Sequence, residues 1–361
     1  MIKKKNSFKI NYLSADKNYK LICKQILKYK PRVFFVKNRE VYQKIKKKFK
    51  NTKIKVFNNF ELKNFYKTDI TISAIPGIEG LRPTLLAVKS CKKILIANKE
   101  SVICGWHLLK SNSLKYNTDI VPVDSEHYSI FKLLNNEDQN LIKKIYITAS
   151  GGPFLKFKKK EFKKIKPKDA LKHPKWKMGK KISIDSATMV NKALEIIEAK
   201  YLFNLEDSQI DAIIHPQAVV HAMVNYKNGI TTALLNKPDM RIPISTLFFK
   251  FNDYTNKTTE LNLLEYSKLE FYAINTERYP AIKLGKEVMK IGGLAPNAFN
   301  YLNEILVSYF LKNVIKFADI TALNEINLEK IFAKNHNIVN PKLIDIKNIN
   351  NWIDKNLILK Y

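Results

Sequence analysis

The first third of the chain alternates short hydrophobic runs with longer amphipathic stretches. Between the hydrophobic runs, residues 18–29 and 39–50 space their apolar positions as a helix does. This alternation predicts an α/β fold with a doubly wound, mostly parallel sheet and helices on both faces. The predicted strands are rich in β-branched and aromatic residues and cover residues 8–13, 33–36, 53–57, 68–75, 93–97 and 119–123.

The pattern changes in the middle of the chain and again near its end. A helix is predicted at residues 187–203, among strand-like runs that indicate an α+β domain with an open sheet. These runs cover residues 144–148, 212–215, 219–226 and 230–235. Helical spacing then dominates and predicts a C-terminal helical bundle, at residues 281–291, 295–310, 326–334 and 346–356.

Composition narrows the class of protein. The 361 residues are 45% hydrophobic, and no apolar run approaches the length of a membrane span. The N-terminus lacks the apolar stretch of a signal peptide, and three scattered cysteines suit a reducing compartment, so we expect a cytoplasmic protein. The formal charge of +32 comes mostly from Lys. We interpret it as solvated Lys-rich faces rather than a nucleic-acid site, since no nucleic-acid motif accompanies it.

Two segments combine the residue types that bind metal and phosphate. Asp124 and Glu126 follow the predicted strand 119–123 at i and i+2, which would place both carboxylates on one side near its carboxyl end. Asn191 and Glu195 are i and i+4 on a predicted helix with Lys192 between them, and Ser186 lies near its expected start, where free N–H groups favour anions. The set suits a phosphorylated ligand beside a metal. The alternative is an amphipathic helix with a capping Ser and an ordinary i,i+4 pair.

Other polar segments have a functional and a structural interpretation. Residues 98–100 are three polar residues that follow the end of a hydrophobic strand. They could carry function, or they could mark a helix start with Ser101 as the cap. The turn at 150–153 lets backbone approach a ligand, and residues 173–179 could fold over a substrate as a lid. His215 and His221 could be zinc ligands, but without a third soft ligand at a suitable spacing we favour structural histidines.

Seven stretches resemble one family, 1-deoxy-D-xylulose 5-phosphate reductoisomerase, which acts in non-mevalonate isoprenoid biosynthesis. They occur in the family's order and span nearly the whole chain: LIANKES (95–101), PVDSEH (122–127), ASGGPF (149–154), HPKWKMGKKISIDSATMVNKALEIIEA (173–199), IHPQAVVHAMV (214–224), KPDMRIPI (237–244) and RYPAIKL (278–284). The resemblance implies an oxidoreductase that rearranges and reduces 1-deoxy-D-xylulose 5-phosphate to 2-C-methyl-D-erythritol 4-phosphate, with NADPH and Mg²⁺ or Mn²⁺. It also implies a homodimer.

The resemblance assigns roles to individual residues. Asp124, Glu126 and Glu195 would bind the metal, and Lys99 would contact the reacting oxygens. The substrate would also meet Ser125 and, at its phosphate end, Ser150, His173, Ser186, Asn191 and Lys192. Trp176 and Met178 would belong to the lid, residues 172–182. NADPH would be contacted by Lys17, Asn18, Asn98, Glu100, Gly179 and Met240. The implied domains are a cofactor domain (1–123), a catalytic and dimerisation domain (124–250), a linker (251–277) and a helical domain (278–361).

The chain departs from the family pattern at its start. The family's first strand and its Gly-rich phosphate turn have no counterpart, because the first glycine is Gly77 and residues 8–13 match the second strand. We therefore expect two strands without a shared partner. A start codon placed too late would explain this, and mass spectrometry of the native N-terminus would test it. The alternative is a decayed homologue that binds metal and phosphosugar without turnover. Asp16, where the family usually has Gly, adds negative charge near the expected ribose phosphate.

Overall fold

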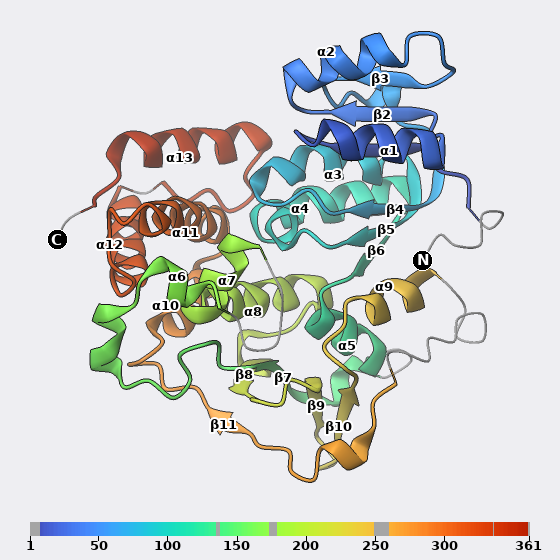
Figure 1. Ribbon diagram of the computed structural model, residues 1–361. Coiled ribbons are helices and arrows are strands. Elements are labelled where there is room, and N and C mark those ends of the chain that lie inside the picture. The colour runs from blue at the N-terminus through green and yellow to red at the C-terminus, as the bar shows by residue number, and fades with distance from the viewer. Residues whose placement is uncertain (1–7, 135–137, 173–178, 249–259, 335, 360–361) are drawn as a thin grey trace.

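The structure is a computed structural model that describes residues 8–134, 138–172, 179–248, 260–334 and 336–359. Its N-terminal part contains two three-stranded parallel sheets (Figure 1). The outer sheet has the order β1 (Tyr12–Ala15), β2 (Val33–Val36) and β3 (Lys55–Phe57). The inner sheet has the order β4 (Thr68–Ser73), β5 (Cys91–Ile96) and β6 (Asp119–Pro122).

Helices connect these strands, as the alternating pattern predicts: α1 (Tyr19–Tyr29), α2 (Arg39–Lys48), α3 (Leu81–Val88) and α4 (Lys99–Tyr116). Asn18 caps α1 by accepting a hydrogen bond from Leu21 N at 3.0 Å. Ile22 and Ile26 bury one face of α1, because residues four apart share a helix face. They pack with residues of β2 and α2 in a small hydrophobic cluster that is separate from the main core.

The two N-terminal sheets meet through side chains. The Tyr12 hydroxyl lies 2.5 Å from Thr71 Oγ1, and Asn11 Nδ2 donates to the carbonyl of Lys67 at 3.0 Å. Within the described residues, β1 bonds only to β2 and β4 bonds only to β5. These edges are the two strands that the sequence predicts to lack a shared partner.

A five-stranded mixed sheet forms the lower part of Figure 1. Its order is β10 (Thr231–Leu235), β9 (Val220–Tyr226), β7 (Ile142–Ala149), β8 (Ile210–Ile214) and β11 (Tyr272–Ala273). The helices of this region are α5 (Ser125–Leu133), α6 (Pro167–Ala170), α7 (Lys180–Ala187), α8 (Val190–Phe203) and α9 (Arg241–Phe248). Short 3₁₀ turns cover Leu62–Asn64, Ile78–Gly80, Gln139–Leu141, Lys159–Lys164, Asp207–Gln209 and Leu263–Glu265.

Helix α8 connects the three regions. It packs against α4 of the N-terminal part and against α10 of the C-terminal helices. Gly285 permits the close approach of α10, since a Cβ built there would lie 2.7 Å from the Cβ of Ala193. The C-terminal bundle comprises α10 (Pro280–Ile291), α11 (Ala295–Leu311), α12 (Asp319–Ala333) and α13 (Leu343–Asn356). One hydrophobic core runs from α3 and α4 through α8 into this bundle, which fixes the parts that surround the site.

The structure corrects three local predictions. The predicted helix 187–203 is two helices, because Met189 takes a left-handed conformation with φ 63° between α7 and α8. Ser186 consequently lies in the last turn of α7 rather than near a helix start. Strand β6 ends at Pro122, and Asp124 caps α5 by accepting from Glu126 N at 3.4 Å. The carboxylates of Asp124 and Glu126 are therefore placed by a helix start, not by strand alternation. No helix in the described part of the chain combines the length and the apolar character that a bilayer crossing requires.

Candidate active site

Two carboxylates at the start of α5 meet a third on α8, which lies much later in the sequence. Asp124 caps α5, Glu126 lies in its first turn, and Glu195 lies on α8. One oxygen from each of these side chains lies within 4.8 Å of the others. The left-handed conformation of Met189 sets the residue at which α8 begins. This start places Glu195 beside the N-terminal end of α5.

Two lysines bind these carboxylates. Lys99 Nζ lies 3.0 Å from Asp124 Oδ2 and 2.9 Å from Glu195 Oε1. Lys192 Nζ lies 2.8 Å from Glu126 Oε1 and also contacts Glu195 Oε2. Each ammonium group therefore joins two carboxylates, and Glu195 is shared between both.

Burial makes these charges interact strongly, because little water screens them. Glu195 is 1% exposed and Lys192 is 4% exposed. Burial and the neighbouring charge of Glu195 raise the pKa of Glu126 to about 7. Burial alone would raise the pKa of Asp124 as well, but the charge of Lys99 holds it well below its usual range. The carboxylates thus differ in proton affinity although they share one site.

The residues fit a divalent cation of the hard type. Carboxylate oxygens are the ligands that Mg²⁺ and Mn²⁺ prefer. The oxygens of Asp124, Glu126 and Glu195 are separated by no more than 4.8 Å, close to the roughly 4 Å between ligands on opposite sides of a Mg²⁺ ion. With Lys99 and Lys192 charged, three carboxylates leave one negative charge uncompensated, which a bound cation would neutralise.

Further polar side chains line the same cluster. Ser125 donates to Glu126 Oε2 at 2.5 Å. Asn191 accepts from Lys99 Nζ at 2.8 Å and donates to Glu195. The turn with Ser150 lies beside the end of α7, since a Cβ on Gly152 would meet the Ser186 carbonyl at 3.1 Å. The structure therefore places the predicted substrate residues Ser125, Asn191 and Lys192 around the carboxylates, and Ser150 close to Ser186.

The predicted cofactor residues are more dispersed. Glu100 lies at the start of α4, 3.8 Å from Lys181 Nζ, and Gly179 begins α7. Met240 packs against the hydrophobic cluster of Leu95, Val121 and Val123, beside α9. Lys17 and Asn18 are exposed at the start of α1 in the outer sheet region.

Asn98 has a structural role that the sequence did not predict. Its Oδ1 accepts from Ser101 N at 2.6 Å and so caps α4, in place of the alternative cap Ser101. Its Nδ2 donates to the carbonyls of Ile75 and Gly77, the latter at 3.0 Å. Asn98 therefore ties the turn at residues 75–77 to the helix that carries Lys99.

His173, Trp176 and Met178 lie outside the described residues, as does most of the predicted lid at 172–182. The two histidines after this segment make hydrogen bonds within the fold. His215 Nδ1 lies 2.9 Å from the Glu270 carbonyl, and His221 Nε2 lies 3.2 Å from the Asn236 carbonyl. Burial lowers the pKa of His221 to about 4. These contacts agree with the structural interpretation that the sequence favoured.

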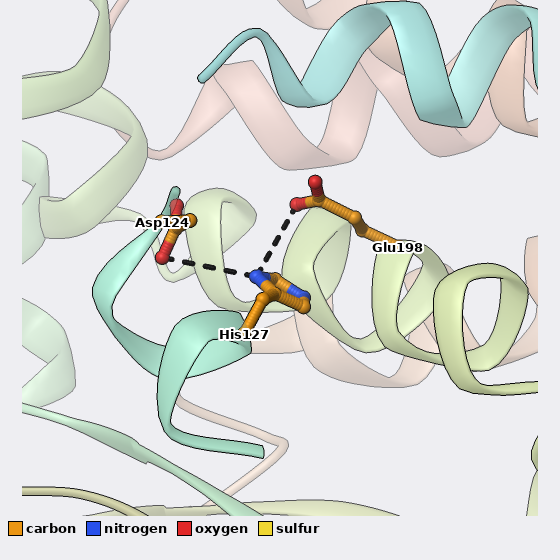
Figure 2. Close-up of side chains that lie close together, drawn as sticks. All are labelled: Asp124, His127 and Glu198. Carbon is orange, nitrogen blue, oxygen red and sulfur yellow. Dashed lines mark ion pairs between the residues drawn. The ribbon is translucent and has the colours of Figure 1, made fainter. Parts of the chain in front are cut away.

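Sequence reasoning missed two buried residues behind the carboxylates. His127 and Glu198 lie on α5 and α8 and point toward each other (Figure 2). Their exposed fractions are 0% and 1%. A signal was available, since Glu198 follows Glu195 by three positions and so shares its helix face.

Comparisons with known proteins agree with this architecture. Family models described as 1-deoxy-D-xylulose 5-phosphate reductoisomerase match residues 1–105, its C-terminal domain 120–203, and the DXP reductoisomerase C-terminal domain 235–356. The reductoisomerase of Pelagibacter ubique is 42% identical over 96% of this chain and 91% of its own, and that of Macrococcus caseolyticus is 39% identical over 89% and 85%.

Solved structures agree as well. The reductoisomerase from Zymomonas mobilis in complex with NADPH superposes with a TM-score of 0.86 at 32% identity, covering 96% of this chain and 89% of that one. DOX-P reductoisomerase in complex with NADPH, fosmidomycin and magnesium gives 0.89 at 30% identity, covering 97% and 91%. The α/β architecture, the carboxylate cluster and these relatives together show that the chain belongs to the 1-deoxy-D-xylulose 5-phosphate reductoisomerase family.

Proposed function

We propose that this chain converts 1-deoxy-D-xylulose 5-phosphate to 2-C-methyl-D-erythritol 4-phosphate, with NADPH as the reductant and Mg²⁺ or Mn²⁺ as the metal. The product belongs to non-mevalonate isoprenoid biosynthesis. The observation that carries the proposal is the buried cluster of Asp124, Glu126 and Glu195 around Lys99 and Lys192. A family relative solved with NADPH and magnesium supports the choice of cofactors.

Asp124, Glu126 and Glu195 would hold the metal through their carboxylate oxygens. When bound, the metal supplies Lewis-acid polarisation of the substrate's keto and hydroxyl oxygens. The protein keeps these carboxylates aligned without the ion, because Lys99 and Lys192 bridge them at hydrogen-bond distance. The site is therefore preorganised for a cation, and little rearrangement is needed on binding.

The two lysines would have different roles toward the substrate. Lys99 lies between Asp124 and Glu195, so its ammonium group can donate to oxygens held at the metal and stabilise negative charge that develops there. Lys192 lies toward Glu126 in the first turn of α8, one position after Asn191. With Ser150, His173 and Ser186 it would bind the phosphate end, and Ser125 would contact the substrate beside the metal.

NADPH would lie along the carboxyl ends of the inner sheet. Asn98 caps α4, the helix whose first residues are Lys99 and Glu100. A cofactor bound at this helix start would lie next to the substrate carbon that is reduced. Gly179 would also contact NADPH, Met240 would pack near the nicotinamide, and Lys17 with Asn18 would lie near the ribose phosphate. Trp176 and Met178 would close over the substrate and exclude water.

The proposal extends to the organisation of the protein. The cofactor domain would cover residues 1–123, the catalytic domain 124–250 and the helical domain 278–361, with a linker at 251–277. The protein would act in the cytoplasm as a homodimer.

Turnover by the purified chain tests this function. We expect NADPH oxidation that requires both 1-deoxy-D-xylulose 5-phosphate and Mn²⁺ or Mg²⁺, that stops with a chelator, and that yields a product with the mass of 2-C-methyl-D-erythritol 4-phosphate. A chain that binds Mn²⁺ and the phosphosugar but oxidises no NADPH would be the decayed homologue. Gel filtration with light scattering tests the homodimer.

A further inference from the structure

A buried histidine connects the carboxylate cluster to a fourth carboxylate that the proposed function does not use. His127 Nε2 lies 3.0 Å from the backbone carbonyl of Glu195. Its Nδ1 lies 3.4 Å from Glu198 Oε2 and 3.8 Å from Asp124 Oδ1 (Figure 2). The imidazole of His127 therefore contacts two of the three proposed metal ligands, the backbone of Glu195 and the carboxylate of Asp124.

The partners of the ring determine how it is held. A carbonyl oxygen only accepts, so Nε2 must carry a hydrogen toward Glu195. The other edge of the ring faces two carboxylates, with Nδ1 at 3.4 Å from Glu198 Oε2 and at 3.8 Å from Asp124 Oδ1. The imidazole is therefore held between the backbone of Glu195 and the carboxylates of Glu198 and Asp124.

Among the described residues, His127 is the one ion-pair partner of Glu198. The Oε2 atom of Glu198 is buried and, within these residues, forms no hydrogen bond, which leaves the ion pair with His127 at 3.4 Å. A buried carboxylate is costly unless a charge compensates it. Glu198 thus lies buried against the edge of the His127 ring that faces Asp124.

We propose that Glu198 is a positioning residue, which holds His127 and through it fixes the Asp124 carboxylate and the backbone of Glu195 for the divalent cation. The inference rests on the metal site of the proposed function. Without the Glu198 carboxylate, Nδ1 of the ring would face Asp124 alone, and the ring would turn toward that carboxylate and compete with the cation for it. Outer partners of metal ligands commonly change metal affinity by about 10- to 100-fold.

Binding of Mn²⁺ to the free protein tests this role without substrate or NADPH. Electron paramagnetic resonance titrations above pH 7 should give one ion per chain for the parent. Glu198→Gln keeps the side-chain shape, and should bind Mn²⁺ about tenfold more weakly. Its kcat at saturating Mn²⁺ should fall much less than its apparent Mn²⁺ affinity. The matched control is Glu304→Gln on α11, a partly buried carboxylate whose Oε2 also lacks a hydrogen bond, and its affinity should equal that of the parent.

A double-mutant cycle shows whether Glu198 acts through His127. If it does, Glu198→Gln combined with His127→Gln should weaken Mn²⁺ binding no more than His127→Gln alone. Additive losses would overturn the inference, as would parent-like affinity in Glu198→Gln. A second Mn²⁺ equivalent in the parent that disappears in Glu198→Gln would also overturn it, since Asp124, His127 and Glu198 would then be a metal site themselves. A parent that binds no Mn²⁺ would overturn the proposed function and this inference together.

A measurement on the parent alone keeps the test valid if the variants do not fold. In protein labelled with ¹⁵N at histidine and loaded with Mg²⁺, one ring should show a protonated Nε2 whose hydrogen exchanges slowly with water. That signature follows from the buried position of His127 and from the contact of its Nε2 with the Glu195 carbonyl. A His127 ring whose Nε2 hydrogen exchanges fast would contradict the contacts on which the role of Glu198 rests.

Discussion

Replacing Glu195 by Gln tests the centre of the cluster, because this carboxylate accepts from more donors than an amide can. Glu195 accepts a hydrogen bond from Lys99 Nζ at 2.9 Å and also contacts Lys192 Nζ and Asn191 Nδ2. A Gln keeps one accepting oxygen, and its NH₂ group would face a donor. The variant therefore loses at least one charge-assisted hydrogen bond and the negative charge that both lysines share.

The structure limits the cost in stability. Breaking a buried ion pair costs about 3–5 kcal/mol when one charge is left alone. Here each lysine keeps a second carboxylate, Asp124 at 3.0 Å for Lys99 and Glu126 at 2.8 Å for Lys192. We therefore expect Glu195→Gln to lower the free energy of unfolding by about 2 kcal/mol, which is close to the net contribution of one hydrogen bond to a charged group.

The cost in activity should be larger. Lewis-acid stabilisation by a metal is worth several kcal/mol, and it depends on the ligands that hold the ion. If the loss of one ligand removes about 4 kcal/mol of it, kcat falls about a thousandfold. Initial rates of NADPH oxidation at saturating Mn²⁺, compared with urea unfolding of the same preparation, separate the two effects.

Asp211→Asn is the matched control. Asp211 on β8 also lies between two lysines, Lys286 Nζ at 2.7 Å and Lys144 Nζ at 3.0 Å, but outside the carboxylate cluster. We expect it to lower the free energy of unfolding by about 1 kcal/mol and to leave turnover unchanged. The reasoning would be refuted if Glu195→Gln lost no more turnover than its unfolded fraction accounts for.

Three further predictions concern stability and are measured by urea unfolding. The folded protein keeps the buried His221 neutral, with its pKa lowered from 6.5 to about 4, whereas the unfolded chain takes up a proton below 6.5. The stability that the neutral His221 contributes is complete above pH 6.5 and is lost as the pH falls toward 4. The free energy of unfolding should drop by about 2 kcal/mol by pH 5, and His221→Gln should flatten that decline. Gly285→Ala should cost about 2 kcal/mol, because its Cβ would lie 2.7 Å from that of Ala193, and unchanged stability would show that the helices separate freely. Lys181→Met should cost about 3 kcal/mol by leaving the buried Asp185 without the ammonium at 2.8 Å, and Lys181→Arg should recover part of the loss.

Hydrophobic patterning predicted the elements better than their ends. The run Val33–Val36 is a strand over the predicted residues because all four side chains are buried. The first strand was expected at 8–13 but forms at Tyr12–Ala15, because pairing of Tyr12 with Val33 sets its register. Such long-range pairing is not encoded in the local pattern. Nor does local propensity indicate that Met189 would take a positive φ and divide a predicted helix.

The residue types at the site could be predicted, but their shared contacts could not. The resemblance to the family implied that Asp124, Glu126 and Glu195 bind a metal, and the structure brings their oxygens together. That two lysines would each join a pair of carboxylates depends on how α4, α5 and α8 pack. Glu198 was missed because an acidic residue on a helix usually faces water, and only the tertiary fold buries it.

The side-chain junction between β1 and β4 has a consequence for local unfolding. The outer sheet has its own small core and is joined to the rest by contacts such as Tyr12 with Thr71, so it can open as a separate cooperative unit. Amide hydrogens of β2 should then exchange with deuterium faster than those of α8, although β2 is fully buried and α8 only mostly so. If Lys17 and Asn18 bind the ribose phosphate, NADPH should slow exchange in β2, since a ligand stabilises the state that it binds.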